Sequence, residues 1–279
     1  MAERLRFPPL AREMAAEFAG TMILILFGVG VVAQVAAAEI GNHDSIAWAW
    51  GIGVTLGVYV SARLSGGHIN PAVTVSLAVF NRLPWGKVGP YVLAQTAGAF
   101  VAALIVRWNY IEVLAAADPG HTIKTQGVFS TLPGNGTLPV GMWGGFRDQI
   151  IGTAILLFIV MALTDLRNNP PLANLTPVVI GLLVVAIGMA FGTNAGYAIN
   201  PARDFGPRLA QFLTGYGGAW RDQYGDLYFW VPIAGPLIGG VLGTALYLFL
   251  IGRNLPEVED TVTAGAERKP EYDPAEERR

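Results

Sequence analysis

The sequence has 279 residues, of which 53% are hydrophobic and only 14% are charged, and its mean hydropathy is +0.46. Soluble domains carry about 25% charged residues, so this composition excludes a soluble globular domain and requires much of the apolar surface to face lipid. The formal charge of −2 argues against nucleic-acid binding. The absence of cysteine excludes disulfides, three histidines are too few for a metal centre, and no cofactor is expected.

Six long uncharged runs predict membrane crossings, in chain order 18–38, 45–62, 88–106, 149–164, 171–202 and 227–252. A crossing needs about 20 mostly apolar residues, and we place the fifth at about 176–193. The first run could instead be a signal peptide, but signal cores have about 7 to 15 residues and this run is longer. We predict an all-α membrane protein with a channel domain over 13–252, an N-terminal segment over 1–12 and a disordered tail over 253–279.

Lysine and arginine predict the orientation of these crossings. Twelve of the 18 lie before the first run, between the second and third, between the fourth and fifth, or after the sixth. The positive-inside rule therefore predicts that both termini are cytoplasmic. Arg107, Arg147 and Arg203 oppose this bias.

The chain contains an internal repeat at an offset of 130 residues, in which 51–80 aligns with 181–210. The alignment superimposes two motifs, Asn70-Pro71-Ala72 and Asn200-Pro201-Ala202. The repeats, about 13–108 and 146–252, hold three crossings each and are joined by an outer loop, 109–145. Because three is odd, the second repeat is inverted relative to the first, as in many membrane channels and carriers.

After each Asn-Pro-Ala motif comes an apolar segment that is too short to cross, 71–80 and about 201–213. Ten helical residues span about 15 Å, half of a hydrocarbon core of about 30 Å. Asn is a favoured N-cap and Pro a favoured first helical residue. Each motif therefore predicts a half-helix that begins inside the membrane, and inversion brings the two starts together near the midplane.

With these motifs the chain resembles the major intrinsic protein family, the aquaporins and glycerol facilitators, over about 16–253. The resemblance rests on AEFAGT, SGGHINPAVT, AQTAGAF and GYAINPARDFGP. Asp204, Arg208 and Pro236-Leu237 are similar to the glycerol-conducting branch. The resemblance implies an aquaporin-like bundle that assembles as a homotetramer.

The resemblance also implies a selectivity constriction, made of Trp50, Gly188, Tyr197 and Arg203. Gly188 stands where water-selective members have His, which suggests a wider pore, while Tyr197 replaces the Phe of the best-known bacterial pattern. Gln149 stands where the fourth crossing commonly carries Glu, and its counterpart Glu17 is retained. We expect this Gln to weaken the anchoring of the first re-entrant loop.

The residues suggest roles, each with an alternative. Asn70 and Asn200 would cap their helices and turn amide donors to a solute, or only cap. Arg203, expensive inside a membrane, would donate to solute hydroxyls opposite Trp50 and Tyr197, or pair with Asp204. Glu17 would accept from loop amides or relay protons. His68 would line the pore through its carbonyl with its ring packed aside, or act as a gate.

We weigh three classes of function. An ion-coupled carrier needs ion-binding groups at the midplane, where only Glu17 and Arg203 are available, and an intramembrane enzyme needs a catalytic constellation that the spans lack. The prediction is therefore a passive channel in the cell membrane for glycerol, small polyols and water, which excludes ions and protons. Among channels, Gly188, Asp204 and Trp50 favour glycerol over water or a metalloid hydroxide; urea, longer polyols and metalloid acids are not ranked.

Overall fold

The computed structural model describes residues 7–256, and within them it is helical, with one isolated β-bridge between Arg221 and Leu227. The predicted tail is described only as far as residue 256. Six helices are long and apolar enough to cross a membrane: α1 (Pro9–Ala36), α2 (His43–Ser65), α4 (Val88–Asn109), α7 (Met142–Thr164), α8 (Thr176–Ala195) and α10 (Val231–Leu250). In each, 39–44% of the most apolar stretch is buried, so most of these side chains face outward and fit a lipid environment. The six predicted crossings are confirmed.

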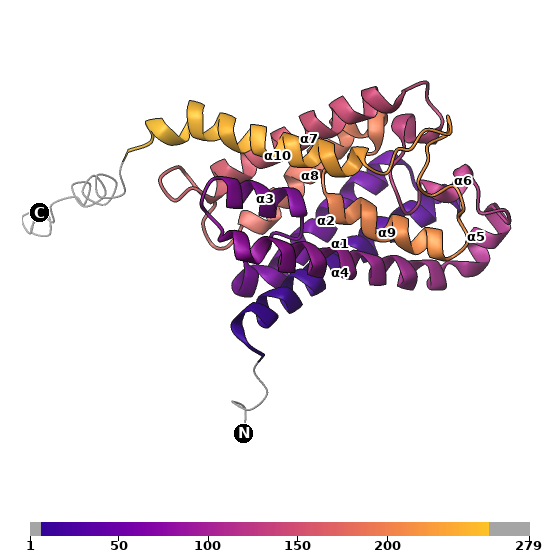
Figure 1. Cartoon of the computed structure of the whole chain (residues 1–279), viewed down its shortest axis with the longest axis horizontal. Helices are drawn as coiled ribbons and strands as arrows, with labels where there is room; N and C mark the ends of the chain where they lie inside the picture. The colour runs from indigo at the N-terminus through magenta and orange to yellow at the C-terminus, as the bar shows by residue number, and fades with distance from the viewer. Residues whose placement is uncertain (1–6, 257–279) are drawn as a thin grey trace, which may run out of the picture.

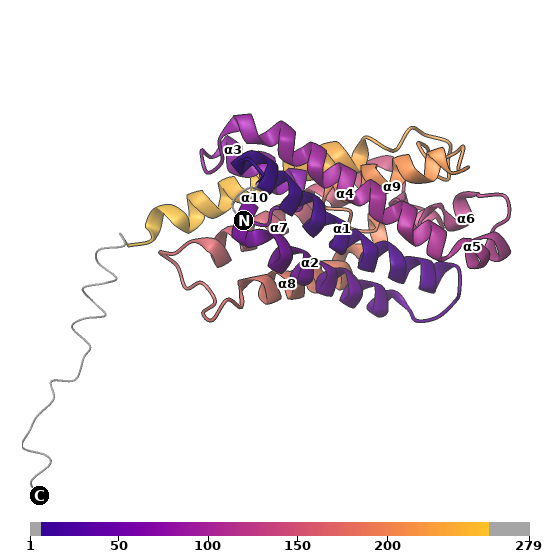
Figure 2. The same cartoon turned by 90° about the horizontal axis from the view of Figure 1, so that it is seen from below.

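Two shorter helices follow the Asn-Pro-Ala motifs, α3 (Pro71–Val79) and α9 (Pro201–Leu213), as predicted. They enter from opposite ends of the bundle (Figure 1). The outer connection holds α5 (Ile111–Ala117), α6 (Ile123–Gln126) and the 3-10 turn η3 (Pro133–Gly136). Two further 3-10 turns are η2 (Trp85–Lys87) and η4 (Gly252–Asn254). The start of α1 and the end of α10 lie toward the same end of the bundle, and α5 and α6 lie at the other (Figures 1 and 2).

Helix packing follows the repeat. In the first half α1 packs against α2 and α4, and in the second half α7 packs in the same way against α8 and α10. Each half-helix packs against the last crossing of the other half, α3 against α10 and α9 against α4. The two halves are therefore interlocked around the half-helices.

Glycines allow the closest helix crossings. An added Cβ at Gly20 would lie 2.7 Å from the Gly57 carbonyl oxygen, and one at Gly51 would lie 2.5 Å from that of Gly181. Because these glycines have no side chains, the backbones of α1 and α2 are in direct contact at their crossing, and so are those of α2 and α8. Such small-residue contacts drive helix association in lipid, where the hydrophobic effect does not.

Candidate functional site

The two half-helices begin at matching asparagine caps. Asn70 accepts the backbone N–H of Ala72 through Oδ1 at 2.8 Å, and Asn200 accepts those of Ala202 and Arg203 at 3.1 and 3.2 Å. In both helices a proline is the first residue, where the missing N–H costs nothing. The predicted helix starts are confirmed.

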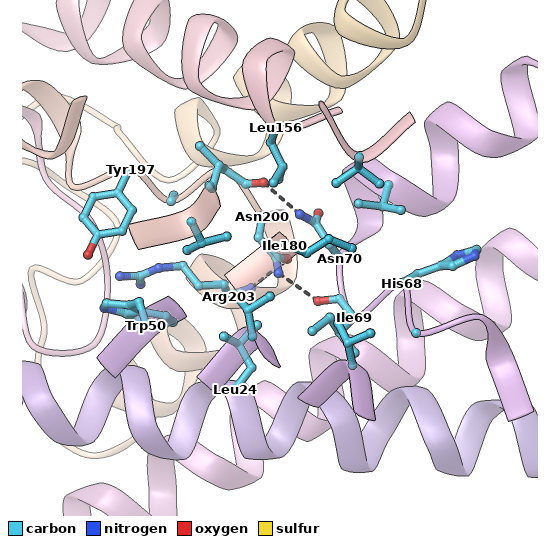
Figure 3. A pocket seen from close by; sticks show the side chains of 18 residues that line it. Leu24, Trp50, His68, Ile69, Asn70, Leu156, Ile180, Tyr197, Asn200 and Arg203 are labelled. Carbon is cyan, nitrogen blue, oxygen red and sulfur yellow. Dashed lines mark hydrogen bonds between the residues drawn. The ribbon is translucent and has the colours of Figure 1, made fainter. Parts of the chain in front are cut away.

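The same asparagines join the two half-helices. Asn70 Nδ2 donates to the carbonyl oxygen of Ile199, and Asn200 Nδ2 donates to that of Ile69, both at 2.8 Å (Figure 3). An amide nitrogen carries two hydrogens, so each asparagine keeps one N–H that this bond does not use. The positive ends of both half-helices are thereby fixed at one point.

The residue before each asparagine has an unusual backbone conformation. Ile69 and Ile199 both have φ of +43°, in the left-handed region that a β-branched residue enters only at an energetic cost. The Ile69 N–H donates to Glu17 Oε2 at 2.7 Å, and the Ile199 N–H donates to Gln149 Oε1 at 2.8 Å. One residue from the first helix of each repeat thus holds the strained turn whose carbonyl meets the other motif.

Glu17 is fully buried and accepts from three donors besides Ile69. These are the His68 N–H at 3.0 Å, Ser65 Oγ at 2.5 Å and Gln95 Nε2 at 2.7 Å. A buried carboxylate is tolerated when such donors replace its water. The expectation that Glu17 accepts from loop amides is confirmed.

The expectation that Gln149 weakens the first re-entrant loop is wrong. Gln149 lies on α7, in the second repeat, and supports the second re-entrant loop: its Nε2 donates to the Ala195 carbonyl at 3.0 Å while its Oε1 accepts from Ile199. An amide can both donate and accept, whereas a carboxylate only accepts. Gln149 therefore makes a bond to Ala195 that a glutamate could not make.

Two cavities lie on either side of three shared residues. An inner cavity of about 80 Å³ is lined by both asparagines, the turns before them and apolar side chains of α1, α2, α7 and α8. An outer cavity of about 220 Å³ is bounded by the outer loop and the ends of α1, α2 and α8. Trp50, Tyr197 and Arg203 line both cavities, so these three side chains form the wall between them.

Figure 3 shows Tyr197, Trp50 and Arg203 together at one end of the inner cavity, with Asn70 and Asn200 in its middle and His68 at its other end. The Arg203 guanidinium lies over the Trp50 ring, 4.1 Å from its centroid, a favourable cation–π distance. Arg203 is 6% exposed, and its Nη1 has no hydrogen-bond partner within 7–256. A buried donor in this state lacks the partner that such groups normally have.

Gly188 lies behind Tyr197 and lines neither cavity. A Cβ added at Gly188 would lie 2.8 Å from Tyr197 Cζ, closer than side chains pack. The space that the missing side chain leaves is therefore filled by the Tyr197 ring. Gly188 sets the position of Tyr197 and does not itself widen the passage.

The alternative pairing of Arg203 with Asp204 is not observed. Asp204 Oδ1 instead accepts from Arg208 Nε at 2.7 Å, one helical turn further along α9, and both side chains are fully buried. Asp204 Oδ2 also accepts from the N–H and hydroxyl of Thr131, both at 2.7 Å. This ion pair fastens the outer loop to α9 and leaves Arg203 free to face the cavities.

His68 lines the inner cavity, and its ring is held to one side. Nδ1 lies 3.1 Å from Thr74 Oγ1, and the ring packs against Tyr91 with centroids 5.3 Å apart. These contacts fit the expectation of a ring packed aside and a backbone that faces the passage.

His43 is a site residue for which no role was predicted from the sequence. It lines the outer cavity, and its Nε2 lies 2.9 Å from the Gly188 carbonyl oxygen. A carbonyl only accepts, so Nε2 carries the proton in this bond. The sequence signal was the seven-residue spacing from His43 to Trp50, which places both on one face of α2.

The fold and the site together define a class: a helical membrane protein of inverted repeats whose half-helices meet between two cavities. The chain belongs to the major intrinsic protein family, whose model matches residues 4–247, and it is therefore a channel and not an enzyme. It is 42% identical over 269 residues to "Aquaporin-10" of Milnesium tardigradum, covering 91% of this chain and 66% of that protein. It is 39% identical over 258 residues to "Propanediol uptake facilitator PduF" of Salmonella typhimurium, covering 88% and 96%.

A solved structure is also similar, the aquaglyceroporin from Plasmodium falciparum, with 31% identity and a TM-score of 0.79. The match covers 87% of this chain and 97% of the other. The similarity over nearly all of both chains agrees with the aquaporin-like bundle expected from the sequence.

Proposed function

We propose that this chain is a passive channel that conducts glycerol and other small uncharged solutes together with water, and excludes ions and protons. The observation that carries the proposal is the wall between the two cavities. There an Arg203 donor that has no partner among residues 7–256 lies beside the apolar face of Trp50. A polyol presents hydroxyls on one side and carbons on the other, so this pairing suits its passage.

The inner cavity supports the same reading. Its walls are mainly Val, Leu and Ile, while the amides of Asn70 and Asn200 supply the polar groups at its middle. A neutral solute that leaves its water behind can bond to these amides, and its carbon atoms can contact the apolar side.

Ion exclusion follows from the two half-helices. Each N-terminus carries a partial charge of about +0.5, and both point at one place. With the Arg203 guanidinium nearby, a cation entering the passage meets positive potential and no carboxylate ligand among the cavity-lining residues. Cations and protons are therefore repelled, as in other pores with helix ends of this kind.

The names of the relatives mention both glycerol, within "aquaglyceroporin", and propanediol. We propose glycerol as the principal polyol. It is tested by stopped-flow light scattering on proteoliposomes in a glycerol gradient and, separately, in an impermeant-sugar gradient. Fast reswelling in glycerol with a low activation energy supports it, and fast water flux with glycerol flux at the level of empty vesicles refutes it.

A matched pair on α2 tests the route. Val54 lines the inner cavity, whereas Val60 is 52% exposed on the outer surface of the same helix. V54W is expected to abolish glycerol and water flux, and V60W to leave both unchanged. Size-exclusion chromatography in detergent checks that both variants fold, and equal flux in the two would place the route elsewhere.

The channel domain over 13–252 is proposed to lie in the cell membrane with both termini cytoplasmic, from the distribution of Lys and Arg. We also propose a homotetramer, which the family resemblance implies. Large exposed apolar side chains such as Trp48, Ile52, Leu182 and Met189 could serve as contacts between subunits. Light scattering of the detergent-solubilised protein should give four copies per particle, and a reporter fused to the C-terminus should respond from the cytoplasm.

A further inference from the structure

A contact between two basic side chains fixes the outer loop to the end of α4. Arg107 Nη2 lies 3.2 Å from His121 Nε2 and also donates to the Thr214 carbonyl at 2.7 Å. A guanidinium can only donate hydrogen bonds, so His121 Nε2 is the acceptor and the proton of the neutral ring is on Nδ1. The contact therefore exists only while His121 is uncharged.

The turn that follows α9 encloses the same ring. The His121 ring stacks on Tyr216, with 5.0 Å between centroids and 29° between planes, and a Cβ added at Gly215 would lie 2.8 Å from His121 Nδ1. The backbone of His121 has a φ of +51°, a left-handed conformation that costs energy in residues other than glycine. Because the packed ring holds this conformation in place, release of the ring would also release the backbone of the loop. We call Arg107, His121 and Tyr216 the clamp.

The titratable and charged groups around His121 do not balance a positive charge on its ring. Arg107 faces it from α4 and Tyr216 from the turn after α9, while Lys124 on α6 is a further cation, bonded to a carbonyl at the end of α5. Asp118, after α5, accepts hydrogen bonds from two threonines of the same loop, and within residues 7–256 none joins it to the His121 ring. Protonation of His121 would therefore place two cations 3.2 Å apart, where they repel each other.

The clamp holds the loop from the side away from the outer cavity. α5 and α6 lie beside the ends of α4 and α9 at this end of the bundle (Figures 1 and 2). Ile123 and Lys124, just after His121, line the outer cavity, whereas none of the three clamp residues lines either cavity. A ring expelled from between Arg107 and Tyr216 therefore moves the segment 121–124 toward the cavity and narrows its entrance.

We propose that the clamp is a pH switch, which keeps the outer entrance open while His121 is neutral and lets the segment 121–124 close on the entrance when His121 is protonated. Histidine is the side chain whose charge ordinarily changes between about pH 5 and 8. This regulation rests on the proposed function, because the flux that it changes is that of glycerol and water through the same passage.

The switch is tested by glycerol and water flux into proteoliposomes at about pH 7.5 and about pH 5.5, with the same pH inside and outside. Both wild-type fluxes should fall in acid by about twofold to tenfold, the effect of one hydrogen bond. In H121Q the amide oxygen can still accept from Arg107 but gains no proton in this range, so both fluxes should stay high. E112Q changes an exposed carboxylate on α5 of the same loop and should keep the wild-type response.

Equal wild-type flux at the two pH values would overturn the switch. A fall in acid that persists in H121Q would also overturn it, and would assign the response to another group, such as His43 or His68. R107Q removes the cation that repels protonated His121, so its flux should not depend on pH, whereas R107K keeps a cation and should keep the response. The opposite result for this pair would show that repulsion from residue 107 is not the cause.

Hydrogen exchange of the backbone amides of 118–124 tests the movement without any solute. Wild type and H121Q are compared at the same pH, so that the intrinsic pH dependence of exchange cancels. Exchange should be faster in wild type than in H121Q in acid and equal at neutral pH, and equal exchange in acid would overturn the switch. Glycerol flux no faster than that of empty vesicles at both pH values would instead refute the proposed function, while faster exchange in acid would still support the clamp.

Discussion

Replacing Gly188 with alanine tests whether this glycine sets the width of the passage through Tyr197. The added carbon would lie 2.8 Å from Tyr197 Cζ, 3.0 Å from Cε2 and 3.1 Å from Oη. Ordinary contact begins at 3.4 Å, so the ring must move by about 0.6 Å, the difference between 3.4 and 2.8 Å. Because the backbone of α8 lies behind the ring, we expect the movement to be toward Arg203 and Trp50.

The size of the effect follows from the cost of overpacking. Inserting one carbon into a packed site costs about 1–3 kcal/mol, and each 1.36 kcal/mol changes a rate tenfold. If this cost falls on the occupied passage, glycerol permeability in G188A drops by about fivefold to 160-fold, while water permeability falls less because water is smaller. Alanine is also the better helix former by about 1 kcal/mol, so thermal stability should change little.

The control is Gly30 on α1, where an added Cβ meets no atom within 4 Å. G30A should keep wild-type flux in the stopped-flow assay. Adding Y197A to G188A removes the displaced ring and should restore glycerol flux. Glycerol flux in G188A within twofold of that in G30A, or a double variant that stays as blocked as G188A, would show that Gly188 does not set the width through Tyr197.

Three further predictions concern stability, measured by thermal unfolding in detergent. E17Q should lower the free energy of unfolding by about 1.5–3 kcal/mol, because an amide cannot accept hydrogen bonds from every donor that now bonds to the Glu17 carboxylate. A melting curve identical to that of the wild type would contradict this. D204N should lower the free energy of unfolding by about 3–5 kcal/mol, because Arg208 stays buried without its charge partner. D204N/R208M should recover part of that free energy. A double variant no more stable than D204N would argue against a stabilising role of the ion pair. Burial tends to raise the pKa of Asp118 in the outer loop, but hydrogen bonds from Thr125 and Thr122 outweigh it and keep the pKa below its usual value. The ionised form of Asp118 therefore stabilises the fold above the unfolded pKa of about 3.9, and this stabilisation is lost as pH falls through the folded pKa. D118N should be less stable than wild type at pH 7 and equally stable in acid. A difference in stability that does not depend on pH would exclude the Asp118 carboxylate as its cause.

The membrane crossings and the half-helices could be predicted from the sequence because their signals are local. Long apolar runs need no knowledge of packing, and Asn followed by Pro marks a helix start by its own chemistry. α1 nevertheless begins at Pro9, nine residues before the predicted run. Hydropathy placed that boundary after Glu17, whereas the helix already includes charged residues that have partners elsewhere in the fold, such as Lys87 of η2 for Glu13.

The partners of side chains were harder to predict. Asp204 precedes Arg208 by four residues, a spacing that favours contact on a helix, yet adjacency suggested Arg203. Gln149 was assigned to the wrong loop, although the repeat pairs it with Glu17 and so with the second turn. The contacts among His43, Gly188 and Tyr197 join α2, α8 and the turn that follows α8, and no local pattern in the sequence contains them.

The internal repeat also explains how the selective wall can lie at one end of the passage and not at the other. Shifting the residues Trp50, Gly188, Tyr197 and Arg203 by 130 positions gives their counterparts in the other half, Ile180, Val58, Gly67 and Val73. All four counterparts line the inner cavity. The backbone therefore offers two equivalent sets of positions. This chain places Trp50, Tyr197 and Arg203 in one set, with Gly188 behind Tyr197, and small or aliphatic side chains in the other. Selectivity in such a fold is a property of side chains at one set, so substitutions there can retune the solute while the symmetric scaffold that holds the half-helices stays unchanged.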